Sequence, residues 1–111
     1  MEKKASYDVK VQRLLQKIVR VKYVMPTLPS SAFNVDVIVQ MGQSIKENGC
    51  VAPMILERTG DEAYKVVQGN LIYHACNTSS IKQINAFVAD NPNQSAVFLK
   101  QFKLNVIGNI G

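Results

Sequence analysis

A chain of 111 residues, of which 47% are hydrophobic and 19% charged, is long enough to bury one core and too apolar to be intrinsically disordered. Its longest apolar runs fall far below the roughly 18 residues that cross a bilayer, and its first residues lack the apolar stretch of a secretory signal. One histidine and two isolated cysteines, Cys50 and Cys76, predict neither a zinc site nor a disulfide framework, and they fit a reducing cytoplasm.

The first 22 residues carry the whole net charge of +5. They hold seven basic and two acidic residues, whereas the remaining residues hold six of each sign. We therefore assign residues 1–22 to a basic N-terminal arm and residues 23–111 to the folded unit, within a single domain overall. Any electrostatic partner is expected at the arm.

The first predicted element is a helix over residues 7–20. Apolar side chains recur at helical spacing on one of its sides, at Val11, Leu14, Leu15 and Ile18. Basic side chains recur on another side, at Lys10, Arg13, Lys17 and Arg20. This basic stripe fits contact with nucleic-acid phosphates or with an acidic lipid or protein surface, and equally a solvated helix face. Residues 21–24 predict a short strand, and an extended loop with two prolines follows.

The second predicted helix begins after Asn34, a good N-cap, and ends at Gly49, which fits the C′ position. Four of its apolar residues are expected to face the core: Val35, Ile38, Met41 and Ile45. Gly42 lowers helix propensity by about 1 kcal/mol relative to alanine. We therefore expect this glycine to permit a close contact between the helix and the sheet.

Short strands and two further helices follow along the chain. Strands are predicted over residues 54–58, 63–68 and 84–90, the first two joined by a tight turn in which Gly60 and Asp61 tolerate positive φ. Helices are predicted over residues 70–77 and 93–105. The latter has an apolar stripe of Val97, Phe98, Leu99 and Phe102. This order predicts the α+β class, with a small mixed sheet and packed helices.

Residues 33–90 resemble the N-terminal domain of ParB-type partition proteins and the sulfiredoxin-like fold that they share. The resemblance rests on a small residue and Ser-Ile in a helix, a glycine, a proline before a strand, and a glycine-led helix with an aromatic and an alanine. These residues are Gly42, Ser44, Ile45, Gly49, Pro53, Gly69, Tyr73 and Ala75. More narrowly, "YHA" with a later "INAFV" resembles small ParB-like proteins of cyanobacteria. The resemblance implies a ParB/sulfiredoxin-like fold.

The turn "VVQGNLIYHA", residues 66–75, departs from this family in its chemistry. The resemblance implies a nucleotide-phosphate site here, built from an acid and two arginines after the glycine. The present chain has Asn70, Leu71 and Ile72 at those positions. In sulfiredoxins the reactive cysteine falls where Asn70 stands, and an amide forms no thiolate. We therefore assign no catalytic residue and favour a non-catalytic protein, with a nucleotide hydrolase as an alternative.

Six residues around this turn nevertheless remain candidates for ligand binding: Gly69, Asn70, Leu71, Ile72, Tyr73 and His74. A helix N-terminus offers N–H groups to an anion, but Asn70 could instead cap the helix, which is worth about 1 kcal/mol. We favour the cap, because the missing arginines remove charge-assisted contacts worth ~1.5–3 kcal/mol each. Leu71 and Ile72 are either buried against a neighbouring element or form a contact patch. The lone His74 is interpreted as structural.

Three hypotheses of function follow. The first is a non-catalytic module of partition or regulation type, associated with DNA through Lys10, Arg13, Lys17 and Arg20. No helix-turn-helix pattern is visible, so sequence readout is expected from a partner. The second is a nucleotide-binding switch or hydrolase for CTP or ATP that uses the Gly69 turn. The third is a protein-interaction module, a homodimer that pairs through Leu71, Ile72 and the last helix. No metal, membrane or cofactor other than a nucleotide is expected.

Overall fold

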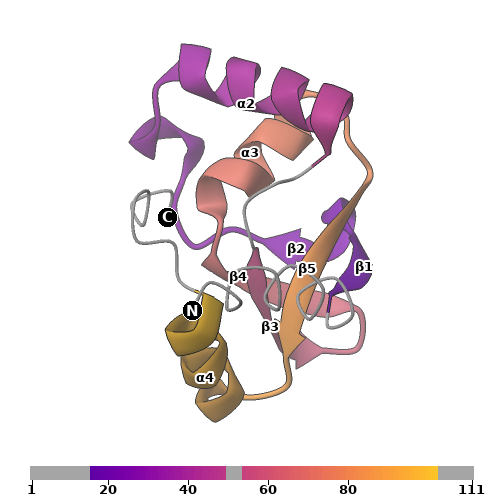
Figure 1. Ribbon diagram of the computed structural model, residues 1–111, viewed down its shortest axis with the longest axis vertical. Helices are drawn as coiled ribbons and strands as arrows, with labels where there is room; N and C mark the ends of the chain where they lie inside the picture. Colours follow the sequence, from indigo (N-terminus) through magenta and orange to yellow (C-terminus); the bar gives the residue numbers. More distant parts are fainter. Residues whose placement is uncertain (1–15, 50–53, 103–111) are drawn as a thin grey trace, which may run out of the picture.

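The computed structural model describes residues 16–49 and 54–102, and it contains a five-stranded mixed sheet with helices on both faces (Figure 1). The strands are β1 (Lys17–Arg20), β2 (Val24–Met25), β3 (Ile55–Gly60), β4 (Ala63–Gln68) and β5 (Gln83–Ala89). The helices are α2 (Val35–Asn48), α3 (Asn70–Thr78) and α4 (Pro92–Phe102), with 3₁₀ turns η1 (Val21–Tyr23) and η2 (Ser30–Ala32). The predicted α+β class, with a small mixed sheet and packed helices, is confirmed.

The strands lie in the order β1-β5-β3-β4-β2. β1 and β5 are antiparallel, as are β3 and β4, whereas β3 runs parallel to β5 and β2 parallel to β4. The predicted hairpin of β3 and β4 is confirmed, but the residue with positive φ is neither Gly60 nor Asp61. β3 continues through Gly60, which pairs with Ala63, so the turn consists of Asp61 and Glu62. Glu62 takes the positive φ, at 51°.

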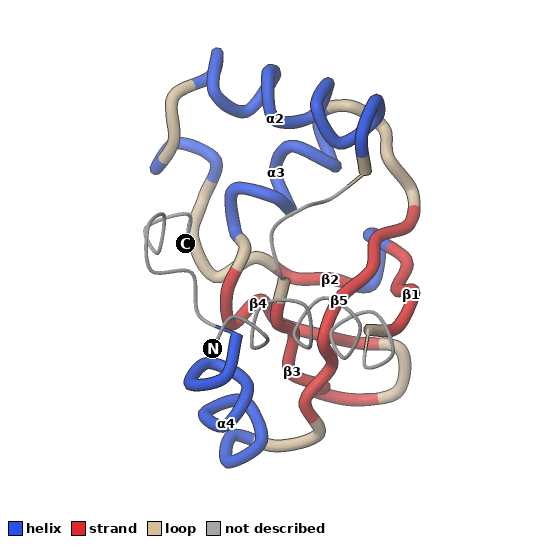
Figure 2. The backbone as a smooth tube through the Cα atoms, viewed as in Figure 1, coloured by secondary structure: helices blue, strands red, loops and turns tan. Residues whose placement is uncertain are grey.

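The two faces of the sheet bury separate apolar clusters, because successive strand residues point to opposite sides. Leu56, Val66 and Ile84 belong to the larger cluster, which they share with α2 and α3. Ile55 and Phe87 lie on the other face and pack against α4. Figure 2 shows the resulting layers, with α2 and α3 on one side of the strands and α4 on the other.

Helix α2 begins and ends where predicted, but its buried residues and its packing partner differ from the prediction. The Asn34 side chain accepts hydrogen bonds from the first turn, and Gly49 has a φ of 82°. Val35, expected inside, is 71% exposed, because α2 lies over α3 and buries mainly Ile38 and Gly42. A Cβ on Gly42 would lie 3.0 Å from the carbonyl oxygen of Ala75 in α3. The glycine therefore permits a close contact between two helices, not between helix and sheet.

The helix predicted over residues 7–20 is wrong for its last four residues, which form strand β1. Residues 7–15 lie outside the described part of the chain. The predicted strand over 21–24 is also wrong for residues 21–23, which form η1. Ile18 and Val19 are β-branched and fit a strand, and pairing with β5 decides between strand and helix. Lys17 and Arg20, three positions apart, consequently leave β1 on opposite sides.

The last described helix, α4, buries Ser95 and half-buries Phe98 and Leu99. These positions share one helix side, which places Val97 on the opposite side with 50% exposure. Val97, predicted to belong to the apolar stripe of this helix, therefore lies apart from Phe98 and Leu99. Residues 103–105 of the predicted helix lie outside the described part of the chain, as does the side chain of Phe102. Within residues 16–49 and 54–102, no helix has the length and hydrophobicity needed to span a membrane.

Candidate functional site

The glycine turn at Gly69 joins β4 to α3 and is dictated by the fold. Its φ of 116° lies in the region that favours glycine. A Cβ at this position would stand 2.9 Å from Cγ of the buried Met54. The Tyr73 N–H donates to the Gly69 carbonyl at 2.9 Å, so Gly69 is the N-cap and Asn70 is the first residue of the helix. The prediction that Asn70 caps α3 is therefore wrong.

The Asn70 side chain fastens a distant loop to the beginning of α3. Its Oδ1 accepts hydrogen bonds from the backbone N–H groups of Thr27 and Leu28, at 2.8 and 3.1 Å. Its Nδ2 donates to Oγ1 of Thr27 at 3.0 Å. We call Thr27–Leu28 the covering segment; it belongs to the stretch between β2 and η2 that passes beside the beginning of α3 (Figure 2). The amide, 2% exposed, is thus engaged within the chain.

Two further hydrogen bonds hold the covering segment. Oγ1 of Thr27 donates to the Val66 carbonyl at 3.0 Å. Nε2 of His74 lies 2.7 Å from the Leu28 carbonyl, and a carbonyl only accepts, so this ring nitrogen donates. The His74 ring is buried and meets Tyr73 edge-on, with centroids 5.0 Å apart. His74 therefore has the structural contacts expected of it.

The two residues that stand at the family's arginine positions are both buried in the larger cluster. Ile72 is 1% exposed and Leu71 is 7% exposed. Of the two alternatives for these side chains, burial against neighbouring elements is the one that the structure supports. The turn thus brings all six candidate residues together. The Asn70 amide and the His74 ring, however, already form hydrogen bonds within the chain. The two positions where the family has arginines hold buried apolar side chains.

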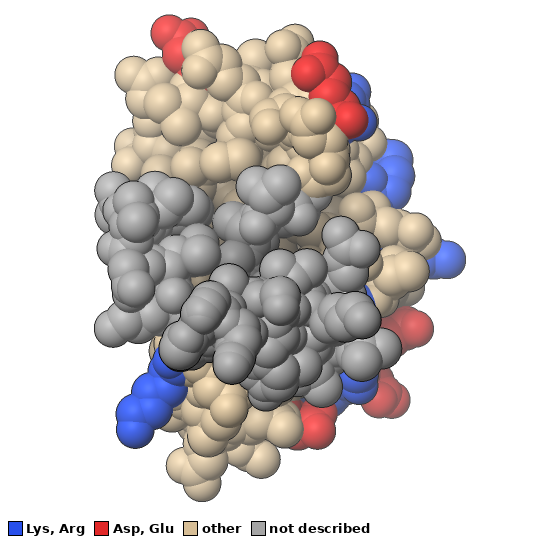
Figure 3. All heavy atoms as spheres, in the orientation of Figure 1, with Lys and Arg blue, Asp and Glu red and all other residues tan. Residues whose placement is uncertain are grey.

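The predicted basic stripe is only partly described. Lys10 and Arg13 lie outside the described residues, whereas Lys17 and Arg20 are exposed on β1. Among described residues, neither forms an ion pair. By contrast, Arg58 lies 3.3 Å from Asp90, and this hydrogen bond is the main cause that raises the pKa of Arg58. In Figure 3, Lys and Arg side chains line the right-hand margin at the level of β1 and the beginning of β5.

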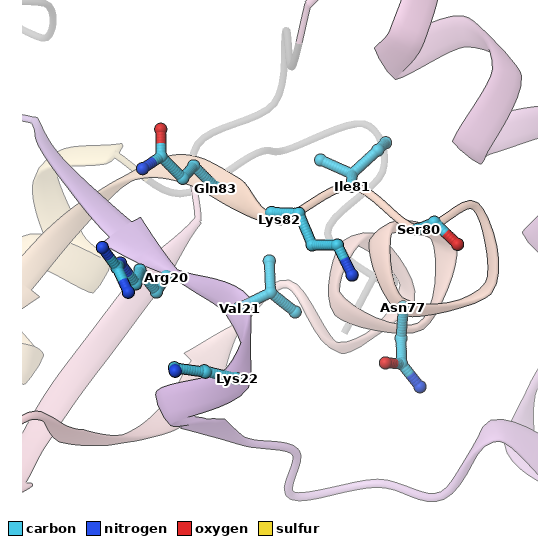
Figure 4. A pocket seen from close by; sticks show the side chains of 8 residues that line it. All are labelled: Arg20, Val21, Lys22, Asn77, Ser80, Ile81, Lys82 and Gln83. Atoms are coloured by element: carbon cyan, nitrogen blue, oxygen red, sulfur yellow. The ribbon is translucent and has the colours of Figure 1, made fainter.

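A pocket of about 620 Å³ opens beside these cations, at the end of α3 (Figure 4). Its walls come from the end of β1, from η1, and from the loop that leads from α3 into β5. The lining residues are Arg20, Val21, Lys22, Asn77, Ser80, Ile81, Lys82 and Gln83. Sequence reasoning missed this site. The signal that could have found it is the pairing of Arg20 with Gln83 across β1 and β5, which the expected helix concealed.

Other kinds of site find no support in the described structure. No group of three or more His, Cys, Asp or Glu residues that could hold a metal ion occurs among residues 16–49 and 54–102. The Cys76 side chain is fully buried in the core. Cys50 lies outside the described residues.

Comparisons with known proteins agree with this fold. The model of the ParB N-terminal domain matches residues 4–102. None of the curated proteins matches the sequence. The chain is similar in structure to a C-terminally truncated ParB from Caulobacter crescentus complexed with CTP-γ-S, with a TM-score of 0.60 and 15% identity. That match covers 85% of the present chain and 58% of the ParB chain, which is less than two thirds of it.

Two other solved structures are also similar, and the matches to ParB and to sulfiredoxin confirm the predicted ParB/sulfiredoxin-like fold. Sulfiredoxin from Arabidopsis thaliana matches with a TM-score of 0.57 and 15% identity, over 73% of this chain and 93% of that one. A free serine kinase in complex with AMP matches with a TM-score of 0.54 and 16% identity, over 68% and 31%. At these identities the structural likeness shows the fold alone. Because the family model spans most of the sequence, the chain belongs to the ParB N-terminal domain family.

Proposed function

We propose that the chain is a non-catalytic, cytoplasmic ParB-like module that associates with duplex DNA through contacts between its N-terminal cations and backbone phosphates. The observation that carries this proposal is the exposure of Lys17 and Arg20, which form no ion pair with an acidic side chain within the described residues. They belong to the first 22 residues, which hold the whole net charge. A cation that forms no ion pair in the protein can bind a phosphate without first losing another favourable charge contact.

The position of β1 suits such contacts. β1 is an edge strand, so side chains from both of its sides lie close to the same margin of the sheet. Lys and Arg side chains are long enough to extend past that margin while their aliphatic stems stay on the protein. Lys17 and Arg20 could therefore follow one DNA backbone even though they leave the strand on opposite sides. Lys10 and Arg13 would add further phosphate contacts.

The family supports a DNA partner. A Caulobacter crescentus ParB complexed to the centromeric parS site has a fold similar to this chain, with a TM-score of 0.59 and 15% identity. That match covers 76% of this chain and 45% of the ParB chain, so DNA association is carried over here as a proposal. Phosphate contacts give affinity without sequence preference, and we expect any sequence readout to come from a partner.

The two other hypotheses stay predictions with weaker support. Nucleotide binding through the Asn70 side chain would have to replace its hydrogen bonds to the backbone of the covering segment. A homodimer that pairs through Leu71 and Ile72 would need two side chains that are buried within one copy. The DNA proposal needs neither change.

The test is the salt dependence of binding to an arbitrary duplex, measured by fluorescence anisotropy of a labelled oligonucleotide. Affinity falls as salt rises, so a plot of log affinity against log salt has a negative slope. Each lost phosphate contact should make this slope less steep by about 1. We expect the double variant Lys17→Ala/Arg20→Ala to reduce this slope by about 2 and to weaken binding equally for all sequences.

The matched control is Lys100→Ala, an exposed cation on α4, away from β1. It should leave both affinity and slope close to those of the unchanged protein. Binding that is absent at low salt, that ignores salt, or that responds equally to both substitutions would overturn the proposal.

A further inference from the structure

The pocket beside η1 is a separate site from the Gly69 turn. The turn precedes Asn70, and the pocket adjoins Asn77 and Ser80, so the two lie at opposite ends of α3. Eight steps of helical rise separate these ends by about 12 Å. A ligand in the pocket would therefore leave the covering segment in place.

The pocket combines three cations with no carboxylate. Arg20, Lys22 and Lys82 all line it, and none of its eight lining residues is acidic. In the described part of the chain these cations form no ion pair, although Nζ of Lys22 lies 5.2 Å from the centre of the Tyr23 ring. Like charges gathered around one hollow repel one another, and a bound anion relieves that repulsion.

Figure 4 shows how the side chains are placed. Lys82 extends into the space between Val21 and the end of α3, where Asn77 and Ser80 lie. Arg20 and Lys22 come from the opposite wall and extend outward. Both are exposed, so they are free to turn toward a ligand by ordinary rotamer changes. Lys82 already faces the hollow, and the other two cations stand at its rim.

The loop after α3 adds hydrogen-bonding groups on a fixed backbone. The Ile81 N–H donates to the Cys76 carbonyl at 2.9 Å, and the Ser80 N–H to the Asn77 carbonyl at 3.4 Å. These two bonds form a Schellman motif, in which Ser80 has a φ of 59° where glycine is usual. Asn77 and Ser80 both line the pocket at this end of the helix, and the exposed Ser80 hydroxyl reaches a ligand there by rotation about χ1.

One effect opposes an anion here, because the C-terminal end of a helix carries about half a negative charge. The Schellman bonds occupy two of the carbonyl groups that make this charge, those of Cys76 and Asn77. Three full positive charges outweigh the remainder. The balance of charge around the pocket is therefore positive.

We propose that this pocket binds the phosphate of a phosphorylated small molecule of nucleotide size. Lys82 and Arg20 would hold the phosphate with charge-assisted hydrogen bonds, and Ser80 would donate its hydroxyl. The organic part would lie against Val21 and Ile81, the apolar lining residues. The volume falls in the range of about 300–1,000 Å³ of small-molecule sites and exceeds what a lone phosphate fills. Arg20 also belongs to the proposed DNA contact, whereas Lys82 and Ser80 belong to the pocket alone, so the two proposals are tested apart at Lys82 and at Lys17.

The test is a titration of the ¹⁵N-labelled full chain with ADP, followed by amide chemical shifts at constant ionic strength. Sodium pyrophosphate and sodium sulfate serve as comparison ligands. We expect saturable shifts at residues 20–22 and 77–83, with ADP binding more tightly than pyrophosphate and pyrophosphate more tightly than sulfate. Lys82→Ala should weaken ADP binding about 10-fold or more, since it removes a charge-assisted contact.

Two variants keep the outcome clear. Lys17→Ala lies outside the pocket and should leave ADP affinity unchanged while it reduces DNA affinity. Ser80→Gly relieves its backbone and so keeps the fold, yet it should weaken ADP binding a few-fold. Shifts centred on residues 69–73, equal binding of ADP and sulfate, no saturable shift at millimolar ADP, or an unchanged affinity in a folded Lys82→Ala variant would each overturn the proposal.

Discussion

The two ends of helix α3 differ in burial and in charge. At its beginning, the Asn70 amide and the His74 ring are buried and bonded to the covering segment. At its end, Asn77, Ser80 and Lys82 are exposed on a pocket wall. The family resemblance directs attention to the first end, which is closed and uncharged in the described structure. The second end is open and surrounded by cations. A shared fold does not by itself fix where a ligand binds, and the contrast between these two ends is the reason to look for a ligand at the second.

The largest expected effect comes from restoring a family-like arginine at the closed end. Ile72→Arg would place an unpaired charge at a position that is 1% exposed. The cost is several kcal/mol, comparable with the total stability of about 5–15 kcal/mol of a domain. We expect a variant that is unfolded at room temperature, without nucleotide binding. Circular dichroism and amide proton dispersion would measure this.

The control for that variant lies at the open end of the same helix. Thr78 is exposed and is the last residue of α3, so Thr78→Arg should change the free energy of unfolding by less than about 0.5 kcal/mol. If Ile72→Arg were folded and bound a nucleotide at the Gly69 turn, the contrast between a closed and an open end would be wrong.

The next effect concerns the backbone at the closed end. Gly69→Ala would combine a φ of 116° with a Cβ 2.9 Å from the Met54 side chain. Backbone strain and overpacking each cost about 1–3 kcal/mol, so we expect a loss of about 3 kcal/mol in urea unfolding. Gly49→Ala is the matched control, because Gly49 also has positive φ but no atom of the described residues lies within 4 Å of its Cβ position. It should cost about 1 kcal/mol, and equal losses would contradict the packing role of Gly69.

A smaller effect separates the two asparagines of α3. Asn70→Ala removes the acceptor of two backbone N–H groups in the covering segment, and we expect a loss of about 2 kcal/mol. Asn77→Ala, at the exposed end, should cost less than about 0.5 kcal/mol. Urea unfolding followed by circular dichroism measures both. Similar losses in the two variants would mean that the covering segment contributes nothing to stability.

Local signals in the sequence were enough for most of the fold. The Asn34 cap, the Gly49 stop and the alternating strands around residues 61–62 depend on neighbouring residues, so α2 and the β3–β4 hairpin were predicted correctly. Residues 17–20 were not, because their apolar spacing fits a helix while their pairing with β5 decides in favour of a strand. Such pairing joins residues more than sixty positions apart, and no local pattern contains it.

The candidate site shows the same division between local and distant information. The glycine turn was found from its own residues, but the cap role given to Asn70 was wrong. Its amide bonds to Thr27, 43 positions away, which no local pattern indicates. The pocket at the other end depends on the pairing of β1 with β5, so the same error that gave a helix over 17–20 also hid the pocket.

The smallest effect has the opposite sign and concerns the two positive-φ residues that flank α3. The closed end uses glycine at this conformation, whereas the open end uses Ser80, with a φ of 59°. A non-glycine residue there costs about 1 kcal/mol, so Ser80→Gly should raise the free energy of unfolding by up to that amount. Urea unfolding measures the gain, and Ser79→Gly, at the neighbouring C-cap with a φ of −94°, should show none. If Ser80→Gly stabilises the chain yet weakens ADP binding, the serine is kept at a cost to stability for its hydroxyl; if it stabilises the chain and leaves binding intact, the hydroxyl has no part in the pocket.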